Sequence, residues 1–573
     1  MDNAQIARLL GEIGDLLEIR GENAFKIRAY RNAADAVLSS AERIAGFDLP
    51  RLLAIPGIGK DLAAKIMEIA STGSSRYRDE LLAGFPPTIL DLLRLQGVGP
   101  KTVALLHKAL GIGTLDALEE AARAGRLREL RGMGAKKEAL ILKALDEHRR
   151  YEGRHLLADA AEEAARLVGF LQQRAPATEF VPVGSVRRGA ETCGDIDVLA
   201  IGGTPDVMEH IAAYGPVERV LGKGETKASV LLRTGIQADL RLVAPESRGA
   251  ALQYFTGSKA HNIALRDRAL AAGLRLNEYG LYRIDGGERV AGESEASIYA
   301  ELGLDEIPPE LRENRGEIEA ARARRLPRLV DLADLQGDLH AHTDATDGRC
   351  TIEEMAVGAR IAGLTYLAIT DHSRSLAMTG GLDEHAALAH ARRIRATSRR
   401  LQGISLVAGI ECDILPDGRL DLSEDCLAEL DLVIASVHSA FNQDETQMTE
   451  RILRAMASPA VDIIGHPTGR LLLRREAYRV DIEQVVAAAA RLGVMLEISS
   501  QVDRLDLNDV HARLARDRGV MLVINTDSHS DRGFAMLRWG VTVARRAWLE
   551  PGDVANTRDL DQFKAMLRRN RTG

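Results

Sequence analysis

The chain has 573 residues, enough for three or four domains at about 150 residues each, and 46% of them are hydrophobic, which can support a core in each domain. Charged residues make up 28% and interrupt every apolar run of about 18 residues, so we expect no membrane span, no signal peptide and a soluble, cytoplasmic protein. The four cysteines are far apart and form no C-x-x-C pair, which argues against a disulfide framework or a thiolate zinc site.

The net charge of −8 is distributed unevenly along the chain. Residues 1–150 carry a net charge of +3, residues 151–310 carry −7 and residues 311–573 carry −4. The first segment therefore has cations available for phosphates, whereas the excess of carboxylates in the later segments suits metal-dependent sites.

Residues 1–150 have a helical pattern that contains three glycine-rich hairpins, at residues 55–60, 95–101 and 130–136. Two glycines let the backbone approach a phosphate, and the amides at the start of the following helix then point at the anion. A lysine after the loop adds positive charge. We therefore expect phosphate contacts from Gly57, Gly59, Lys60, Gly97, Gly99, Lys101, Gly132 and Gly134.

Between residues 151 and 310 the pattern changes to short β-rich runs separated by helices, which predicts an α+β unit. The expected strands cover residues 180–183, 196–201, 229–233 and 237–243.

Three aspartates in this region form a candidate two-metal cluster. Asp195 and Asp197 alternate along one strand and so share a face, and Asp239 lies on a later strand that can be its neighbour. Upstream, the turn at Gly184 and Ser185 offers a backbone amide and a hydroxyl to phosphate oxygens, and Arg188 offers a counter-charge.

Residues 311–336 follow a Pro-Pro pair and run through a charged helix to a third proline, a composition typical of a linker. From residue 337 onward, strand and helix alternate, and seven strands are predicted: one before His340, then residues 364–370, 404–410, 432–437, 461–464, 494–498 and 521–525. Nearly every strand ends in a potential metal ligand, which is how a β/α barrel builds a site at its C-terminal face.

The middle region resembles the nucleotidyltransferase superfamily through residues 183–189 and 194–198, and its continuation at residues 254–279 resembles the family X DNA polymerases. The resemblance implies metal binding by the three aspartates. It also implies that the following residues bind the nucleotide: Gly184, Ser185, Arg188 and Gly194 at the triphosphate, Tyr254 and Phe255 around the sugar, Asn262 and Arg266 at the minor-groove edge of the base pair, and Gly257. Gln237 stands where better-known members carry an arginine that orients the metal carboxylates.

Residues 23–31 and the hairpins resemble the helix-hairpin-helix part of the same family, which implies binding to the DNA backbone. Lys65 matches the family's Schiff-base lysine of a 5'-deoxyribose phosphate lyase. Such a lysine must be neutral to attack an aldehyde, and Asp61 stands where relatives often carry another lysine and favours the charged form. The alternatives of a lyase and of an ordinary solvated lysine stay open.

The C-terminal region resembles the PHP (polymerase and histidinol phosphatase) family. The resemblance implies phosphoester hydrolysis with up to three divalent metals, Zn²⁺, Mn²⁺ or Fe²⁺, held by His340, His342, Asp347, His372, Glu411, His438, His466, Asp527 and His529. Arg470 is a candidate phosphate clamp or a surface arginine. The run at residues 497–507 departs from the Asn-containing run that usually follows the glutamate.

The order of parts resembles that of bacterial and archaeal family X polymerases with a C-terminal PHP domain. This implies an all-α helix-hairpin-helix region at 1–150, an α+β nucleotidyltransferase palm and thumb similar to polymerase beta at 151–310, the linker, and a distorted (β/α)7 PHP barrel at 337–573. It further implies a monomer that fills gaps in base excision repair, using Mg²⁺ or Mn²⁺, deoxynucleoside triphosphates and gapped or primer-template DNA, with a 3'-5' exonuclease in the barrel.

Two other hypotheses come from different classes of protein. One is a PHP small-molecule phosphatase with an inactive polymerase-like scaffold. The other is a non-catalytic DNA-binding module that recruits partners through its helical repeats. The intact aspartates and the two metal constellations argue against both.

Overall fold

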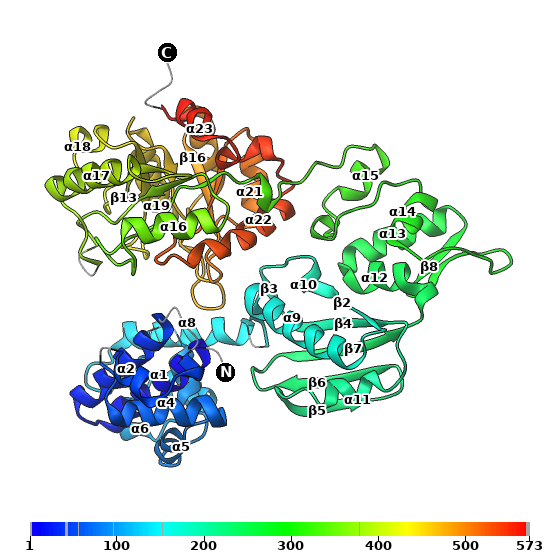
Figure 1. Cartoon of the computed structure of the whole chain (residues 1–573), viewed down its shortest axis with the longest axis horizontal. Helices are drawn as coiled ribbons and strands as arrows, with labels where there is room; N and C mark the ends of the chain where they lie inside the picture. Colours follow the sequence, from blue (N-terminus) through cyan, green and yellow to red (C-terminus); the bar gives the residue numbers. More distant parts are fainter. Residues whose placement is uncertain are drawn as a thin grey trace. The chain divides into compact units, whose positions relative to one another are not determined.

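The computed structural model describes residues 3–39, 44–55, 57–95, 97–151, 153–376 and 379–568. The chain divides into two compact units, Met1–Glu152 and Gly153–Gly573 (Figure 1). Among the described residues, no helix combines the length and the apolar character that crossing a membrane requires.

The first unit is all-helical, as predicted. In the first two hairpins the second glycine, Gly59 or Gly99, is the N-cap of the next helix. The first glycine of each hairpin has a positive φ, which other residues avoid: 84° at Gly57, 79° at Gly97 and 88° at Gly132. The helices are α1 (Asn3–Arg20), α2 (Ala24–Ser39), α3 (Leu49–Leu53), α4 (Lys60–Thr72), α5 (Arg76–Leu82), α6 (Pro100–Leu110), α7 (Leu115–Arg123) and α8 (Ala135–Tyr151).

The second unit begins with an α+β palm whose five-stranded sheet has the order β2-β4-β7-β6-β5. Strands β4 and β7 are parallel, and the other pairs in this sheet are antiparallel. The elements are β1 (His155–Leu156), α9 (Leu157–Arg174), β2 (Glu179–Pro182), α10 (Gly184–Arg187), β3 (Thr192–Cys193), β4 (Asp195–Ile201), α11 (Val207–Ala212), β5 (Val217–Lys223), β6 (Lys227–Leu232) and β7 (Gln237–Val243). Strand β5 was not predicted from the sequence, because this edge strand is exposed along almost its whole length and lacks the alternation of a half-buried strand.

A thumb follows, with α12 (Arg248–Thr256), α13 (Lys259–Ala271), β8 (Leu274–Asn277), β9 (Gly280–Arg283), β10 (Arg289–Ala291), α14 (Glu295–Glu301) and α15 (Glu317–Arg322). Residues 311–336, expected as a linker, contribute to the thumb core through Leu311, Ile318, Ala321 and Leu329. Ile318 and Ala321 are three positions apart on α15, so this short charged helix has one apolar side that packs.

The last part is the predicted parallel barrel, with seven strands paired in sequence order. A parallel bridge between Ala341 and Ser528 joins the region after the first strand to the region after the last, so the barrel is nearly closed. The strands are β11 (Gly337–Asp338), β12 (Tyr366–Ile369), β13 (Ser405–Asp413), β14 (Leu432–Ser436), β15 (Ile463–Ile464), β16 (Met495–Ser499) and β17 (Leu522–Asn525). The helices are α16 (Ile352–Ile361), α17 (Glu384–Ser398), α18 (Glu424–Ala428), α19 (Glu445–Ala457), α20 (Ile482–Leu492), α21 (Asp509–Asp517), α22 (Leu537–Arg546) and α23 (Leu560–Met566).

A buried ion network joins the palm to the thumb. Glu295, at the start of α14, accepts hydrogen bonds from Arg187 at 2.6 Å and from Arg312 at 2.5 Å. Arg312 is fully buried. Burial raises the pKa of Glu295, but the two guanidinium groups outweigh burial and hold the pKa below its usual range. The carboxylate therefore neutralises two cations at the junction next to the Gly184 loop.

Replacing Glu295 with glutamine should destabilise the thumb, because Arg312 would keep a buried charge with its ionic partner removed. We expect a loss of about 3–5 kcal/mol, measured from amide hydrogen exchange in α13 and α14. Glu288→Gln is the matched control, since Glu288 pairs with Arg283 at 3.4 Å on the thumb surface and should cost less than about 1 kcal/mol. Equal effects of the two variants would contradict this account.

Candidate active sites

All nine side chains expected from the PHP resemblance converge on one end of the barrel. Glu411 on β13 is their centre: its carboxylate lies 2.8 Å from Nδ1 of His372, 3.0 Å from Nε2 of His466, 3.3 Å from Nε2 of His438, 3.4 Å from Nε2 of His340 and 3.7 Å from Nε2 of His342. Asp527, after β17, lies 3.0 Å from Nε2 of His342 and 3.7 Å from Nε2 of His340.

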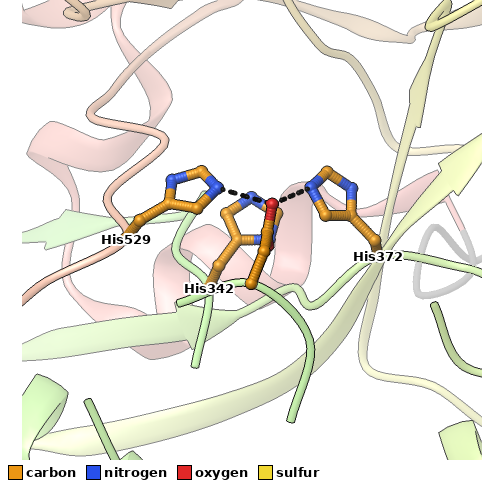
Figure 2. A group of neighbouring side chains, drawn as sticks. His342, His372 and His529 are labelled. Carbon is orange, nitrogen blue, oxygen red and sulfur yellow. Dashed lines mark ion pairs between the residues drawn. The ribbon is translucent and has the colours of Figure 1, made fainter. Parts of the chain in front are cut away.

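Asp347 closes the outer side of this cluster. Figure 2 shows His342, His372 and His529 grouped around one carboxylate, with His372 and His529 turned toward the same oxygen. That oxygen is Oδ2 of Asp347, 3.4 Å from Nε2 of each of these two histidines. Asp347 is 30% exposed and His529 34%, whereas His340 is fully buried. The cluster therefore opens to solvent on the side of Asp347 and His529.

The donor set fits divalent metals. Three groups have ligand atoms within 4.8 Å of one another: His342, Asp347, His372 and His529; His340, His342 and Asp527; and His372, Glu411 and His438. Several of their buried polar atoms have no hydrogen-bond partner, among them Nε2 of His340 and Nδ1 of His342. Buried polar atoms without partners are costly, and bound cations would satisfy them.

Charge within the cluster shifts the histidines in opposite directions. Burial and the neighbouring His529 and His372 lower the pKa of His342 to about 4, so its ring is neutral and ready to ligate. Burial also lowers the pKa of His372, but Glu411 and Asp347 outweigh burial and raise it to about 10. Protons and metal ions therefore compete for the same carboxylate-rich space.

Two further carboxylates orient the ligands and were not identified from the sequence. Glu497 on β16 accepts a hydrogen bond from the amide of His466 at 2.7 Å and lies 2.8 Å from Nδ1 of His340. Asp413 lies 2.8 Å from Nδ1 of His438. These contacts leave Nε2 of each imidazole to face the cluster. Asp413 follows Glu411 by two positions in one strand, a spacing that could have revealed it.

Arg470 has a different role from a phosphate clamp or a free surface arginine. It is 9% exposed, donates to the carbonyls of Arg504 and Leu505, and forms an ion pair with Glu191 of the palm at 2.8 Å. Its contacts thus hold the palm against the barrel.

The palm brings together the second cluster. In the parallel pair of β4 and β7, Asp197 is directly opposite Asp239, so both side chains share one face. Gln237 donates from Nε2 to Oδ1 of Asp239 at 2.9 Å, and the ammonium of Lys227 lies 2.6 Å from Oδ2. Gln237 thus orients this carboxylate as an arginine would, and Lys227 supplies the positive charge.

Like charges perturb this cluster. Burial, followed by the negative charges of Asp195 and Asp239, raises the pKa of Asp197 to about 6. The pKa of Asp239 is lowered, because hydrogen bonds from Lys227 and Gln237 outweigh its burial. Asp239 is thus already paired with a cation. Ionisation of Asp197 is unfavourable without a further positive charge nearby.

Two of the expected triphosphate residues, Gly184 and Gly194, lie next to the aspartates. A Cβ atom at Gly184 would lie 3.0 Å from Oδ2 of Asp197, so this loop passes close to the carboxylate. Ser185 is half-buried on the short helix α10, and Gly194 is exposed just before β4. Arg188 is not free: its Nε donates to Glu313 at 3.0 Å and its Nη1 to the carbonyl of Thr256 at 2.5 Å.

The expected sugar and base residues lie on α12 and α13. The rings of Tyr254 and Phe255 meet edge to face with centroids 5.1 Å apart. Asn262 donates to the carbonyl of Tyr254 at 2.7 Å, which ties the two helices together. Arg266 is exposed, and a Cβ atom at Gly257 would lie 3.2 Å from Nη1 of Arg188.

In the first unit, the hairpin glycines and their lysines are exposed, and no atom lies within 4 Å of a Cβ atom built on any of these glycines. Their amides are therefore accessible to an anion. Lys65 on α4 lies 2.5 Å from Oδ1 of Asp61 and 5.0 Å from the ring centre of Tyr77.

The raised pKa of Asp197 predicts how metal binding at the palm depends on pH. Below about pH 6 a proton occupies this carboxylate and would compete with a divalent cation for it. The Kd for Mn²⁺ at this cluster should be constant above about pH 7 and rise about tenfold per unit below about pH 6. Titrating Mn²⁺ at each pH measures this, and a flat profile down to about pH 5 would rule out Asp197 as the controlling ligand.

Four family models match the chain. They are described as "Helix-hairpin-helix domain" for residues 1–75, "SAM-like Helix-hairpin-helix tandem" for residues 89–147, "DNA polymerase beta thumb" for residues 251–313 and "PHP domain" for residues 338–501. Each matches the part of the fold that the sequence predicted for it.

Among individual proteins, the chain is 38% identical to the DNA polymerase/3'-5' exonuclease PolX of Bacillus subtilis over 573 residues, which is 100% of both chains. It is 30% identical over 242 residues to a probable phosphatase of a Thermoanaerobacter species, covering 40% of this chain and 94% of that protein. A probable phosphatase of Shewanella sediminis is 34% identical over 202 residues, or 34% of this chain and 77% of its own length. The likeness to PolX spans the whole chain, and on this evidence the protein belongs to the PolX family, the family X DNA polymerases with a C-terminal PHP domain.

Proposed function

We propose that this protein is a DNA-directed DNA polymerase that fills short gaps during DNA repair, with a 3'-5' exonuclease in its PHP barrel. The observation that carries the proposal is the presence of two separate carboxylate-rich clusters in one chain, one on the parallel pair β4 and β7 and one at the end of the barrel. The full-length similarity to a polymerase/exonuclease supports it. The comparisons do not favour a phosphatase with an inactive scaffold, because the phosphatase relatives match only 202–242 residues of this chain.

In the palm, Asp195, Asp197 and Asp239 would hold Mg²⁺ or Mn²⁺, and Gly184, Ser185, Arg188 and Gly194 would bind the triphosphate of a deoxynucleotide. Bound divalent ions supply Lewis-acid stabilisation of charge on the phosphates and favour an ionised nucleophile in both clusters. The loop at Gly184 would keep the triphosphate next to Asp197. The packed rings of Tyr254 and Phe255 would contact the sugar. The 3'-hydroxyl of the primer would then attack the α-phosphate in line, with pyrophosphate leaving.

In the barrel, the nine-residue cluster would hold up to three ions of Zn²⁺, Mn²⁺ or Fe²⁺. The 3' end would enter on the exposed side of Asp347 and His529. Water would attack the phosphorus of the last phosphodiester, the bond to the 3'-oxygen of the preceding nucleotide would break, and a nucleoside 5'-monophosphate would leave. The carboxylates of Glu497 and Asp413 keep His340 and His438 in fixed orientations throughout the reaction.

The exposed hairpins of the first unit would grip the backbone of gapped or primer-template DNA through their amides and lysines. We further propose that the protein acts on this DNA as a monomer in the cytoplasm.

Lys65 is the candidate Schiff-base residue for removal of a 5'-deoxyribose phosphate, and its Nζ pairs with Oδ1 of Asp61 at 2.5 Å.

Separate loss of the two activities tests this assignment. Asp197→Ala should lower primer extension about 10³-fold and leave 3' digestion intact, since several kcal/mol of charge stabilisation is lost at one site only. His342→Ala should do the reverse. The exposed residues Asp285 and His385 provide matched controls as alanine variants. Extension that survives Asp197→Ala would refute the polymerase assignment, and digestion that survives His342→Ala would refute the barrel assignment.

Borohydride trapping on DNA with a 5'-deoxyribose phosphate tests the lyase. We expect a covalent adduct with the native protein and none with Lys65→Ala. Asp61→Asn should increase trapping about twofold, because an ion pair between residues four positions apart on a helix is worth about 0.3–0.5 kcal/mol and must break before Lys65 can react. Lys108→Ala, which removes an exposed lysine at the far end of helix α6 and outside the hairpins, is the control. Trapping that persists in Lys65→Ala would exclude Lys65 as the nucleophile.

A further inference from the structure

The nucleotide loop of the palm lies directly against helix α22 of the PHP barrel. Gly189, which ends this loop with a φ of +65°, is so close to α22 that a Cβ atom would come within 2.2 Å of the methyl group of Thr542. Trp539, on the same helix, packs against both the palm core and the barrel core. The loop that carries Arg188 is therefore supported by the barrel.

Arg546, at the end of α22, supports Arg188 both directly and through Glu313. Its Nη1 donates to the backbone carbonyl of Arg188 at 2.8 Å and to Oε1 of Glu313 at 3.0 Å. The same Oε1 accepts the hydrogen bond from Nε of Arg188, also at 3.0 Å. The side chain of Arg546 is only 9% exposed. One barrel residue thus holds both the backbone of Arg188 and the carboxylate that orients its guanidinium.

Asp509 anchors Arg546 from the opposite side. It accepts a hydrogen bond from Nε of Arg546 at 3.1 Å and forms ion pairs with Nη2 of Arg546 at 2.9 Å and with Arg315 at 3.0 Å. Burial raises the pKa of Asp509, but the two arginines outweigh burial and lower it, so the carboxylate is charged. With Arg188 and Glu313, the network has three cations and two anions, which leaves one net positive charge beside the triphosphate site.

We propose that Arg546 is a positioning residue of the polymerase site, so that the PHP barrel forms part of the deoxynucleotide-binding machinery. Arg546 pairs with Glu313 and binds the carbonyl of Arg188. The guanidinium of Arg188 would therefore stay oriented toward the triphosphate, and Glu313 would neutralise its charge only in part. This inference rests on the proposed function, because the binding of triphosphate by Arg188 is part of that proposal. Other ion pairs at the palm–barrel junction, such as Arg538 with Glu162 at 3.0 Å, do not touch the loop.

Steady-state gap filling by the full-length protein tests the inference. Arg546→Gln should raise the KM for the deoxynucleotide about tenfold with kcat changed less than about twofold, because the variant loses the hydrogen bonds that hold Arg188 for ground-state binding of the triphosphate. Arg546→Lys, which keeps the charge, should recover part of the loss. Digestion of single-stranded oligonucleotide 3' ends should not change, since Arg546 is outside the metal cluster.

Arg538→Gln is the matched control, since it removes a cation of the same helix that pairs with the palm away from the loop, and its KM should equal that of the native protein. If Arg546→Gln does not fold, Asp509→Asn loosens Arg546 without touching Arg188 and should raise KM about threefold. The inference would be overturned if both Arg546→Gln and Asp509→Asn had the KM of the native protein. It would also be overturned if Arg546→Gln and Arg538→Gln lost extension and digestion equally. If Arg188→Met also left KM unchanged, the nucleotide-site assignment itself would fall, whereas a raised KM in Arg188→Met alone would leave that assignment standing.

Discussion

Close approach of buried carboxylates is the constraint on which both candidate sites depend. The parallel pairing of β4 and β7 puts Asp197 opposite Asp239, and burial together with its like-charged neighbours raises the pKa of Asp197. Lys227 balances only one of these charges. A divalent cation, with two charges and a preference for oxygen ligands, is the partner that such an arrangement favours.

The barrel meets the same constraint with imidazoles. Three carboxylates lie among six histidines, so each negative charge has several ring nitrogens at 2.8–4.0 Å. The rings differ in state, since the pKa of His342 is lowered and that of His372 is raised. A set that mixes neutral and protonated imidazoles can exchange protons for metal ions with little movement of the chain. Mixed nitrogen and oxygen ligands suit zinc, manganese and iron, in contrast to the oxygen-only cluster of the palm.

Much of the fold followed from local patterns. The three hairpins, four of the five strands in the main palm sheet and all seven barrel strands were predictable, because their glycines, alternating residues and apolar runs are adjacent in the chain. The exposed edge strand β5 and the packing of residues 311–336 on the thumb were not, because both depend on what lies beside them in space. The same holds for the supports of the sites: Glu497 reaches His340 across 157 positions, and Arg546 reaches Arg188 across 358.

The sequence by itself determined which chemical groups this protein has and, through strand periodicity, which of them share a face. Asp195 with Asp197, and the ligands at the strand ends of the barrel, are examples. Only the tertiary structure decided the electrostatic environment of each group: that Gln237 and Lys227 both engage Asp239, that Arg470 holds the palm, and that Arg188 is held by a residue of the barrel. The physical reason is that periodicity is a short-range property of the backbone, whereas burial and ion pairing arise between segments that only folding brings together.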